Sequence, residues 1–211
     1  MAEIALTDYG AGNIRSVERA LTAAGGRVTV TDDPEIVRRA GRIVLSGQGA
    51  FADCMGGLSA RAGLIEALEE RVQWNGAPFL GICVGMQLLA DRGLEHVETR
   101  GLGWIGGVCR ELKPGAGDIL PHTGWNQVRP LPISGRVHPV FDALSPARHC
   151  YFNHSFVLDP PAEARAAETE HGEIFAAGVA RDNLVGIQCH PEKSQAAGLA
   201  LLARFIEWTP R

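Results

Sequence analysis

Apolar residues near the start of the chain change from the period of a strand to that of a helix and back. Residues 4–6 form a short apolar run, and residues 28–30 form another. Between the two runs, apolar side chains recur at helical spacing, at Ile14, Val17, Leu21 and Ala24. This order predicts a βαβ unit. Asn13 is placed to cap the helix, and Gly25 and Gly26 are placed to end it.

The same alternation continues through the middle of the chain. It predicts a strand at residues 43–45, a long helix over 51–72, a buried strand over 78–83 and a helix over 84–90. Strands that alternate with helices are typical of a mostly parallel sheet that is covered by helices on both faces. We therefore expect an α/β fold.

The pattern changes between residues 104 and 158, where short strands are separated by Gly- and Pro-rich turns. This stretch predicts an antiparallel extension packed beside the main sheet. Further strands are expected at 174–179 and 184–189, before a terminal helix that bears Leu199, Leu202 and Ile206. Residues 158–170 are rich in Ala, Pro and Glu and are expected to form a loop, which is too short to link two domains. We therefore expect residues 1–211 to form a single domain.

Composition narrows the classes of ligand and location. The 211 residues are 45% hydrophobic, which is enough to bury one sizeable core. The formal charge of -4 and the pI near 6.0 leave no basic stripe for a phosphate backbone, so we expect no nucleic-acid ligand. The start lacks a basic segment followed by an apolar run, and no run approaches the roughly 18 apolar residues of a membrane span. We expect no targeting segment and no membrane partner.

Five cysteines are scattered along the chain, at Cys54, Cys83, Cys109, Cys150 and Cys189. Their odd number and the lack of any CxxC pair argue against a disulfide framework and against a structural zinc site. A reducing, cytoplasmic location fits this pattern best. No metal is expected, because the adjacent pairs of histidine and cysteine seldom chelate one ion and the other histidines have no spacing that assigns them chemistry. The latter are His122, His138, His154 and His171.

A glycine pair after the first strand resembles the start of a dinucleotide fingerprint. Gly10 and Gly12 have the right spacing, but Arg15 stands where the third glycine is required. We therefore reject a nicotinamide cofactor.

The sequence around Cys83 has the spacing of a nucleophile elbow. Gly81 and Gly85 flank it as in G-x-S-x-G, with cysteine in place of serine. Such a tight turn strains the backbone, and glycines let neighbouring chains approach closely. At the start of a helix the thiolate form is favoured, and the N–H of Val84 would face the developing oxyanion. A random cysteine is more often an inert buried one, but the strand before and the helix after Cys83 favour the elbow.

A histidine and a glutamate follow the late strand at residues 184–189. His190 comes at the carboxyl end of that strand, where open α/β sheets place their sites, and Glu192 lies two residues on. An imidazole that takes the thiol proton and a carboxylate that orients the imidazole complete a cysteine hydrolase. Alone, His190 could be a solvated loop histidine; its pairing with an early Cys83 favours a triad.

Five segments together resemble a known family. They are residues 8–13 (DYGAGN), 81–87 (GICVGMQ), 121–126 (PHTGWN), 151–155 (YFNHS) and 190–194 (HPEKS). The cysteine elbow and His-Pro-Glu resemble the class I, triad-type glutamine amidotransferases. The first, third and fourth segments resemble more narrowly the glutaminase subunits of imidazole glycerol phosphate synthase in histidine biosynthesis.

The resemblance implies a flavodoxin-like fold, no cofactor, and attack of Cys83 on the carboxamide of L-glutamine to give ammonia and a glutamyl thioester. It implies that glutamine is bound by Gln87, Glu95, Ser155 and Phe156. It also implies a second oxyanion donor, beside Val84, from the strand that bears Gly47, Gln48 and Gly49. The family usually reads Pro-Gly-Val-Gly at this strand, whereas this chain has Ser46-Gly47-Gln48-Gly49.

The implied partner is a (β/α)₈-barrel cyclase subunit that forms a heterodimer and receives ammonia through a tunnel. The resemblance implies a docking face lined by Asn13, Trp125, Asn126, Tyr151 and Lys193. Ordinary roles stay open: helix capping for Asn13, packing for the two aromatic residues, and a solvated charge for Lys193.

Three other functions share parts of this pattern: a glutaminase of the vitamin B6 pathway, a γ-glutamyl hydrolase that acts alone, and a non-catalytic binding module of the same fold. The segment around Trp125 argues against the first two. The intact set of Cys83, His190 and Glu192 argues against the third.

Overall fold

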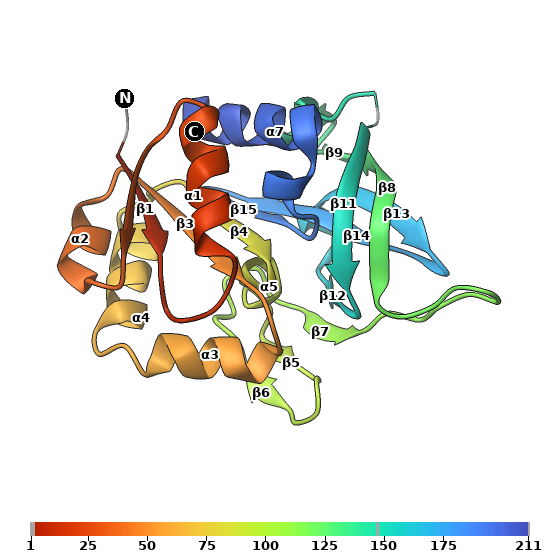
Figure 1. Ribbon diagram of the computed structural model, residues 1–211, viewed down its shortest axis with the longest axis horizontal. Helices are drawn as coiled ribbons and strands as arrows, with labels where there is room; N and C mark the ends of the chain where they lie inside the picture. The colour runs from red at the N-terminus through yellow and green to blue at the C-terminus, as the bar shows by residue number, and fades with distance from the viewer. Residues whose placement is uncertain (1–2, 147, 211) are drawn as a thin grey trace.

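The computed structural model describes residues 3–146 and 148–210. Its largest sheet has nine strands: β1 (Glu3–Thr7), β2 (Arg27–Thr31), β3 (Arg42–Gly47), β4 (Phe79–Cys83), β8 (His122–Pro130), β11 (Arg148–His154), β13 (Arg165–His171), β14 (Glu173–Arg181) and β15 (Leu184–Ile187). Their order is β11-β8-β13-β14-β15-β4-β3-β1-β2, so the sheet runs through the molecule from one side to the other (Figure 1).

The half of the sheet from β2 to β15 is parallel. β1 pairs with β2 and β3, and β4 pairs with β3 and β15, all in parallel. The strand order here is that of flavodoxin-like folds, 2-1-3-4-5 along the chain. Every residue of β3, β4 and β15 is buried, as expected for strands covered on both faces. The α/β fold predicted from the alternating pattern is confirmed.

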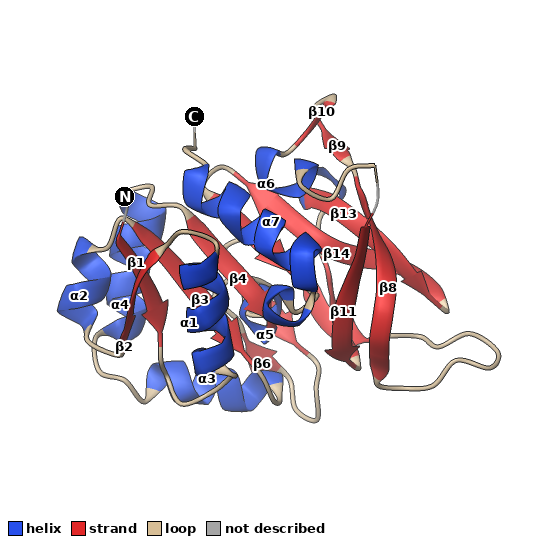
Figure 2. Cartoon of the chain, turned by 45° about the horizontal axis from the view of Figure 1, so that its top comes forward, coloured by secondary structure: helices blue, strands red, loops and turns tan. Residues whose placement is uncertain are grey.

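Helices cover both faces of the parallel half (Figures 1 and 2). The helical elements are α1 (Ile14–Ala23), α2 (Pro34–Arg39), α3 (Phe51–Ser59), α4 (Leu64–Glu69), η1 (Glu70–Trp74), α5 (Val84–Gln87), α6 (Pro139–Asp142), η2 (Ala162–Ala164), η3 (Pro191–Lys193) and α7 (Gln195–Glu207). α1 and α7 pack together on one face, and α2 and α4 pack together on the other. Their buried side chains join those of the strands in one core.

The predicted antiparallel extension continues the main sheet instead of packing beside it. β14, β13, β8 and β11 add to the edge of β15 by successive antiparallel pairs. A smaller sheet has the order β12-β7-β5-β6, from β5 (Arg92–Gly93), β6 (Thr99–Arg100), β7 (Val108–Glu111) and β12 (Phe156–Asp159). A two-stranded ribbon joins β9 (Pro132–Ile133) to β10 (Arg136–Val137).

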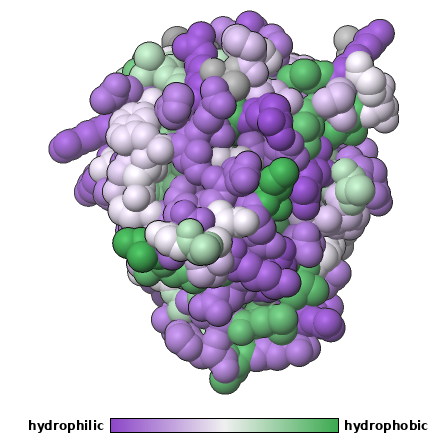
Figure 3. All heavy atoms as spheres, turned by 90° about the vertical axis from the view of Figure 1, so that its right-hand side faces the viewer, coloured by the Kyte–Doolittle hydropathy of each residue, from purple (hydrophilic) through white to green (hydrophobic). Residues whose placement is uncertain are grey.

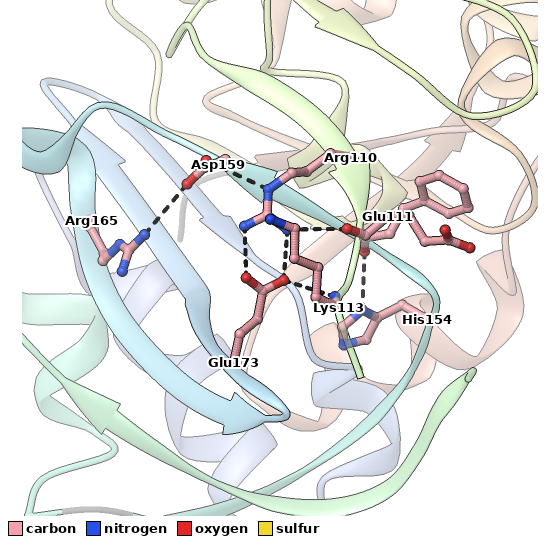
Figure 4. A network of polar contacts seen from close by, with 8 residues as sticks. Arg110, Glu111, Lys113, His154, Asp159, Arg165 and Glu173 are labelled. Carbon is pink, nitrogen blue, oxygen red and sulfur yellow. Dashed lines mark hydrogen bonds and ion pairs between the residues drawn. The ribbon is translucent and has the colours of Figure 1, made fainter. Parts of the chain in front are cut away.

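An ion-pair network ties the smaller sheet to β14. Figure 4 shows the guanidinium of Arg110 between Asp159 and Glu173. Arg110 Nη1 lies 2.6 Å from Glu173 Oε1, and Asp159 also reaches Arg165, at 3.6 Å. The N–H of Lys113 donates to the same Glu173 oxygen at 2.8 Å. Because these contacts join β7, β12 and β14, they fix the segment that enters the candidate active site at β12.

Two of the predicted helices are shorter than expected. The helix over 51–72 is split into α3, α4 and η1, and Gly63 between α3 and α4 has φ +77°. The helix over 84–90 ends at Gln87. The carbonyl groups of Leu88 and Leu89 instead accept bonds from the N–H groups of Leu102 and Ile105. Hydrogen bonds to the loop of residues 102–105 therefore take the place of the last helical turn predicted for residues 84–90.

Two further local predictions were wrong, and one was confirmed. Residues 158–170 are not a loop throughout, because β13 begins at Arg165 and buries Ala166 and Ala167 against the core. Asn13 precedes α1, but its side chain makes no capping hydrogen bond. Gly25 follows α1 with φ +98° and donates to the carbonyl of Thr22, so the predicted end of that helix is confirmed.

The surface on the β8 side of the molecule is mostly hydrophilic, with small separate hydrophobic patches (Figure 3). Across residues 3–146 and 148–210, no helix has the length and apolar character needed to cross a membrane. Over the same residues, no group of three or more His, Cys, Asp or Glu side chains is placed to hold a metal ion.

Candidate active site

Cys83 sits on a strained turn between β4 and α5. It has φ +53°, in the left-handed region that non-glycine residues rarely adopt. A Cβ at Gly81 would meet the carbonyl of Gly85, and a Cβ at Gly85 would overlap the carbonyl of Leu45. Both flanking glycines are therefore required by close approach of the backbone. The strain at Cys83 is of the kind found at functional sites and costs roughly 1–3 kcal/mol.

The helix after Cys83 is only one turn long. A full helix dipole is therefore not available to the thiol, and the free N–H groups of the first turn have to supply the positive end. The Cys83 residue is 3% exposed. The thiol thus lies at the base of a nearly closed site beside backbone donors.

His190 and Glu192 form a buried pair. Nδ1 of His190 lies 2.9 Å from Oε1 of Glu192, and the two side chains are 5% and 1% exposed. Burial by itself lowers the pKa of His190. Hydrogen bonding and Coulomb attraction to Cys83 and Glu192 outweigh burial and raise the pKa to about 9.

The other ring nitrogen of His190 is directed to the nucleophile. Nε2 is buried and has no hydrogen-bond partner of ordinary geometry among the described residues, yet Cys83 is close enough for its charge to raise the pKa of the ring. A hydrogen bond between a thiol and an imidazole tightens when the proton moves, so this proximity is sufficient for proton transfer. Carboxylate, imidazole and thiol therefore lie in series, in the order that nucleophilic catalysis requires.

The segment that carries His190 is held on β11. The N–H of His190 donates to the carbonyl of Tyr151 at 2.8 Å. Ser194 Oγ donates to the carbonyl of His190 at 2.6 Å and accepts from the N–H of Tyr151 at 2.9 Å. Because the edge of the antiparallel half fixes this segment, the imidazole is oriented by backbone contacts as well as by Glu192.

A cavity of about 110 Å³ opens beside the thiol. Its lining includes all four residues predicted to bind substrate, together with Cys83 and its neighbour in α5. The complete lining is Gln48, Gly49, Cys83, Val84, Gln87, Glu95, Asn153, His154, Ser155 and Phe156. Residues from the end of β3, α5 and the start of β12 are thus brought together around the nucleophile.

The predicted oxyanion strand runs beside the elbow. Gly47 pairs with Cys83 across β3 and β4, and a Cβ there would lie 2.6 Å from Tyr9 Oη. Gln48 and Gly49 line the cavity, whereas Gly47 lies behind it. The carbonyl of Gln48 accepts a bond from Cys54 Sγ at 3.8 Å. Since the two ends of a trans peptide point in opposite directions, the N–H of Gly49 points away from that cysteine.

Two of the predicted substrate-binding side chains are held by the protein. Glu95 Oε2 accepts from the N–H of Phe51 at 2.8 Å and so caps the start of α3. Gln87 Nε2 donates to the carbonyl of Phe156 at 2.8 Å and to Gln188 Oε1 at 3.1 Å. Both side chains are therefore pre-positioned at the cavity wall.

Sequence reasoning missed four residues of the site. Gln188 is fully buried and donates from Nε2 to Cys83 Sγ at 3.7 Å. Tyr9 is buried beside Gly47, and Asn153 and His154 line the cavity. Gln188 and Tyr9 are polar residues at or just past the carboxyl ends of predicted strands, and that position could have identified them.

The structure brings together part of the predicted docking face. The rings of Trp125 and Tyr151 are 6.1 Å apart, and Lys193 Nζ lies 5.6 Å from the centre of the Tyr151 ring. Trp125 is 48% exposed. Asn126 follows Trp125 in β8, so its side chain points to the other face of the strand. Asn13 is exposed just before α1, which packs against η3.

The sequence is similar to a known protein family along almost its whole length. The model of the glutamine amidotransferase class-I family matches residues 5–208. The imidazole glycerol phosphate synthase subunit HisH of Caulobacter vibrioides is 47% identical, and the match covers 100% of each chain. The HisH subunit of Zymomonas mobilis is 48% identical over 98% of this chain and 96% of its own. That of Rhodospirillum rubrum is 47% identical, with 98% and 99% covered.

Solved structures share the fold at low sequence identity. A glutamine amidotransferase structure superposes with a TM-score of 0.72 at 17% identity, over 96% of this chain and 97% of that one. A PurLQS structure from Thermotoga maritima gives 0.72 at 18%, with 98% and 99% covered. At these identities the likeness extends to the fold alone.

Proposed function

Because this chain belongs to the class-I glutamine amidotransferases, and within them to the HisH subunits of imidazole glycerol phosphate synthase, we propose that it hydrolyses L-glutamine for a partner subunit. The glutamate is released, and the ammonia passes to a (β/α)₈-barrel cyclase that makes imidazole glycerol phosphate in histidine biosynthesis. The similarity of the whole chain to HisH subunits favours this role over that of a vitamin B6 pathway glutaminase.

One observation carries the proposal: the buried pair of His190 and Glu192 faces Cys83 on its strained elbow. The thiolate attacks the carboxamide carbon of glutamine, and the N–H of Val84 and one from the strand of Gly47, Gln48 and Gly49 stabilise the oxyanion. His190 gives its proton to the departing ammonia. Water, deprotonated by His190, then hydrolyses the glutamyl thioester and restores the thiol.

The cavity supports a compact, polar substrate. The carboxylate of Glu95 is suited to pair with the α-ammonium group of glutamine. Hydrogen bonds to the other polar groups of glutamine can come from the amide of Gln87 and from the backbone of Ser155 and Phe156. The cavity is small, at about 110 Å³, so we expect larger γ-glutamyl compounds to be excluded.

The partner is proposed to bind over Trp125, Tyr151 and Lys193, with Asn13 at the neighbouring start of α1. A half-exposed tryptophan beside a tyrosine and a lysine is typical of the anchor of an interface. Asn126 points to the opposite face of β8, so we propose that it acts from behind the interface.

Glutamate release should be measured with the cyclase and its nucleotide ligand, and again with the cyclase absent. We expect the liganded partner to raise turnover, and unchanged turnover would refute the coupling. The variant Cys83→Ala should lose glutamine hydrolysis while the complex still uses ammonium salts. Hydrolysis by Cys83→Ala would show that another residue is the nucleophile.

A further inference from the structure

Three histidines with no role in the proposed reaction lie together between β8, β11 and β13. His122 and His154 are 4% and 7% exposed. The rings of His122 and His171 are stacked, with their centres 4.3 Å apart, and His171 Nε2 lies 3.0 Å from the carbonyl of Ile119. Buried imidazoles require hydrogen-bond partners, so the contacts of this cluster are informative.

Hydrogen bonds join two of these rings into a chain that begins at Asn126. Asn126 Nδ2 lies 3.2 Å from His122 Nε2, and His122 Nδ1 lies 3.1 Å from His154 Nε2. His154 Nδ1 lies 3.0 Å from the carbonyl oxygen of Phe156. The chain runs from the β8 surface, where Asn126 lines a cavity of about 430 Å³, to the wall of the glutamine cavity.

Only one arrangement of protons satisfies this chain. The carbonyl of Phe156 is an acceptor, so His154 carries its proton on Nδ1. In a neutral ring Nε2 of His154 must then accept, which requires that His122 donate from Nδ1. Nε2 of His122 is consequently an acceptor for the amide of Asn126. Both histidines are therefore neutral Nδ1–H tautomers, and every donor has an acceptor.

The same carbonyl connects the histidines to the nucleophile. The oxygen of Phe156 also accepts from Gln87, which donates to Gln188, which in turn donates to Cys83 Sγ. Hydrogen bonds thus link Asn126 to Cys83 without a break. The members come from β8, β11, β12, α5 and the end of β15, so the chain crosses the parts of the fold that form the site.

We propose that His122 and His154 are positioning residues, which set the carbonyl of Phe156 and through it align Gln87, Gln188 and the thiol of Cys83. Asn126 is the outer end of this arrangement and links its geometry to the exposed strand β8. The proposal rests on the proposed glutaminase function, because alignment matters only if Cys83 attacks a bound substrate.

The electrostatics of the cluster agree with this proton arrangement. Burial lowers the pKa of His122 to about 4, with a further contribution from His171. Burial and the neighbouring His122 lower the pKa of His154 to about 3. Both rings are therefore neutral at neutral pH, as the chain requires.

The test compares two substitutions of histidine by phenylalanine, one at the buried His122 and one at the partly buried His138. His122→Phe keeps an aromatic ring stacked on Phe152 and removes both ring nitrogens from the chain. His138→Phe is the matched control, because the ring of His138 packs near Trp208 and, among the described residues, its one hydrogen bond is from the N–H of Val140 in α6. Glutaminase kcat and KM should be measured on the complex with the liganded cyclase, together with the thermal midpoint of each variant.

We expect His122→Phe to lower kcat/KM by roughly 10- to 100-fold, as small misplacements in an active site do. His138→Phe should stay within about twofold of the wild type, although both variants lose some thermal stability. His122→Asn places an amide donor near the former Nδ1 and should recover part of the loss. In ¹⁵N NMR spectra of the wild type, the signals of His122 and His154 should be those of Nδ1–H tautomers.

Equal kcat/KM for His122→Phe and His138→Phe would overturn the positioning role. NMR spectra that show Nε2–H tautomers at His122 and His154 would also overturn it. So would a His122→Asn variant whose kcat/KM is no higher than that of His122→Phe. These results are distinct from failure of the proposed function, in which the wild-type complex itself would release no glutamate.

Discussion

At the scale of single residues, the chemistry depends on the opposing influences on His190. Burial disfavours its charged form, but hydrogen bonding and Coulomb attraction to Cys83 and to Glu192, which lies 2.9 Å away, outweigh burial and raise its pKa to about 9. A protonated ring next to the proposed nucleophile has a proton ready for the ammonia that leaves. This arrangement supports the role proposed for His190 as the proton donor.

This raised pKa predicts the alkaline limit of activity. The imidazolium persists until the pH reaches about 9 and is lost above it, so kcat/KM for glutamine should be steady around neutral pH and fall as the pH rises through about 9. Glu192→Gln removes a charge that raises the pKa of His190 and should move this fall to lower pH. Initial rates between about pH 6 and about pH 10 test this. An alkaline fall centred on the ordinary histidine pKa, about 6.5, would contradict it.

Gly47 is the residue whose replacement should disturb the oxyanion strand most directly. A Cβ there would lie 2.6 Å from Tyr9 Oη and 2.9 Å from Val84 Cβ. We expect Gly47→Ala to reduce the free energy of unfolding by about 1–3 kcal/mol and to impair glutamine hydrolysis. Gly56→Ala in α3 is the control, because its Cβ meets nothing within 4 Å and should stabilise by about 0.5–1 kcal/mol. Equal free energies of unfolding for Gly47→Ala and Gly56→Ala, measured by urea unfolding, would show that the strand at Gly47 can move to accept the extra methyl group.

At the scale of elements, the imidazole depends on the junction between β11, β15 and α7. Strand β15 ends at Ile187, and the chain then crosses to β11 before α7 begins. Ser194 occupies this crossing and bonds both to the carbonyl of His190 and to the N–H of Tyr151. The antiparallel half of the sheet thus has a direct role in a site whose nucleophile lies on the parallel half.

Ser194→Ala should loosen that junction. It leaves the partly buried N–H of Tyr151 without its acceptor, which costs about 1 kcal/mol in free energy of unfolding. It also frees the carbonyl of His190, so kcat should fall more than KM changes. Thr22→Ala removes an exposed hydroxyl that bonds to the carbonyl of Glu18 in α1 and should change stability by no more than about 0.5 kcal/mol. A Ser194→Ala enzyme with normal kcat would show that Glu192 alone orients the ring.

At the scale of the whole molecule, three histidines that are buried or partly buried are neutral in the folded state. Burial lowers the pKa of His122 and His138 to about 4 and that of His154 to about 3, all below the ordinary 6.5. In the unfolded chain these rings bind protons as the pH falls below about 6.5. Between that pH and the folded-state values, the unfolded state therefore holds more protons than the folded state.

The consequence is a loss of stability on the acid side. Each such histidine should lower the free energy of unfolding by about 1.4 kcal/mol per pH unit as the pH falls from about 6 toward about 4. Urea unfolding at several pH values measures how steeply the free energy of unfolding changes with pH. His138→Phe should reduce this slope by the contribution of one histidine. A free energy of unfolding that stays flat from about pH 7 to about 4.5 would contradict the burial of these groups.

The sequence by itself determined the features that depend on neighbours along the chain. The elbow is specified within five residues, because Gly81 and Gly85 permit the turn that Cys83 needs. The alternation of strand and helix periods likewise determined the α/β class, and the position of His190 and Glu192 after a late strand predicted the partners of Cys83, whereas the flavodoxin-like order came from a family resemblance. Each of these rests on local sterics or on motifs that are contiguous in sequence.

Only the tertiary structure decided which distant polar groups meet. Gln188 donates to Cys83 across 105 positions of sequence, and the bond between His122 and His154 spans 32. The predicted helix over 51–72 broke up, and the one over 84–90 lost its last turn to bonds with residues 102–105. Local propensity carries no information about such contacts, because they form only when the strand order of the sheet places their elements side by side.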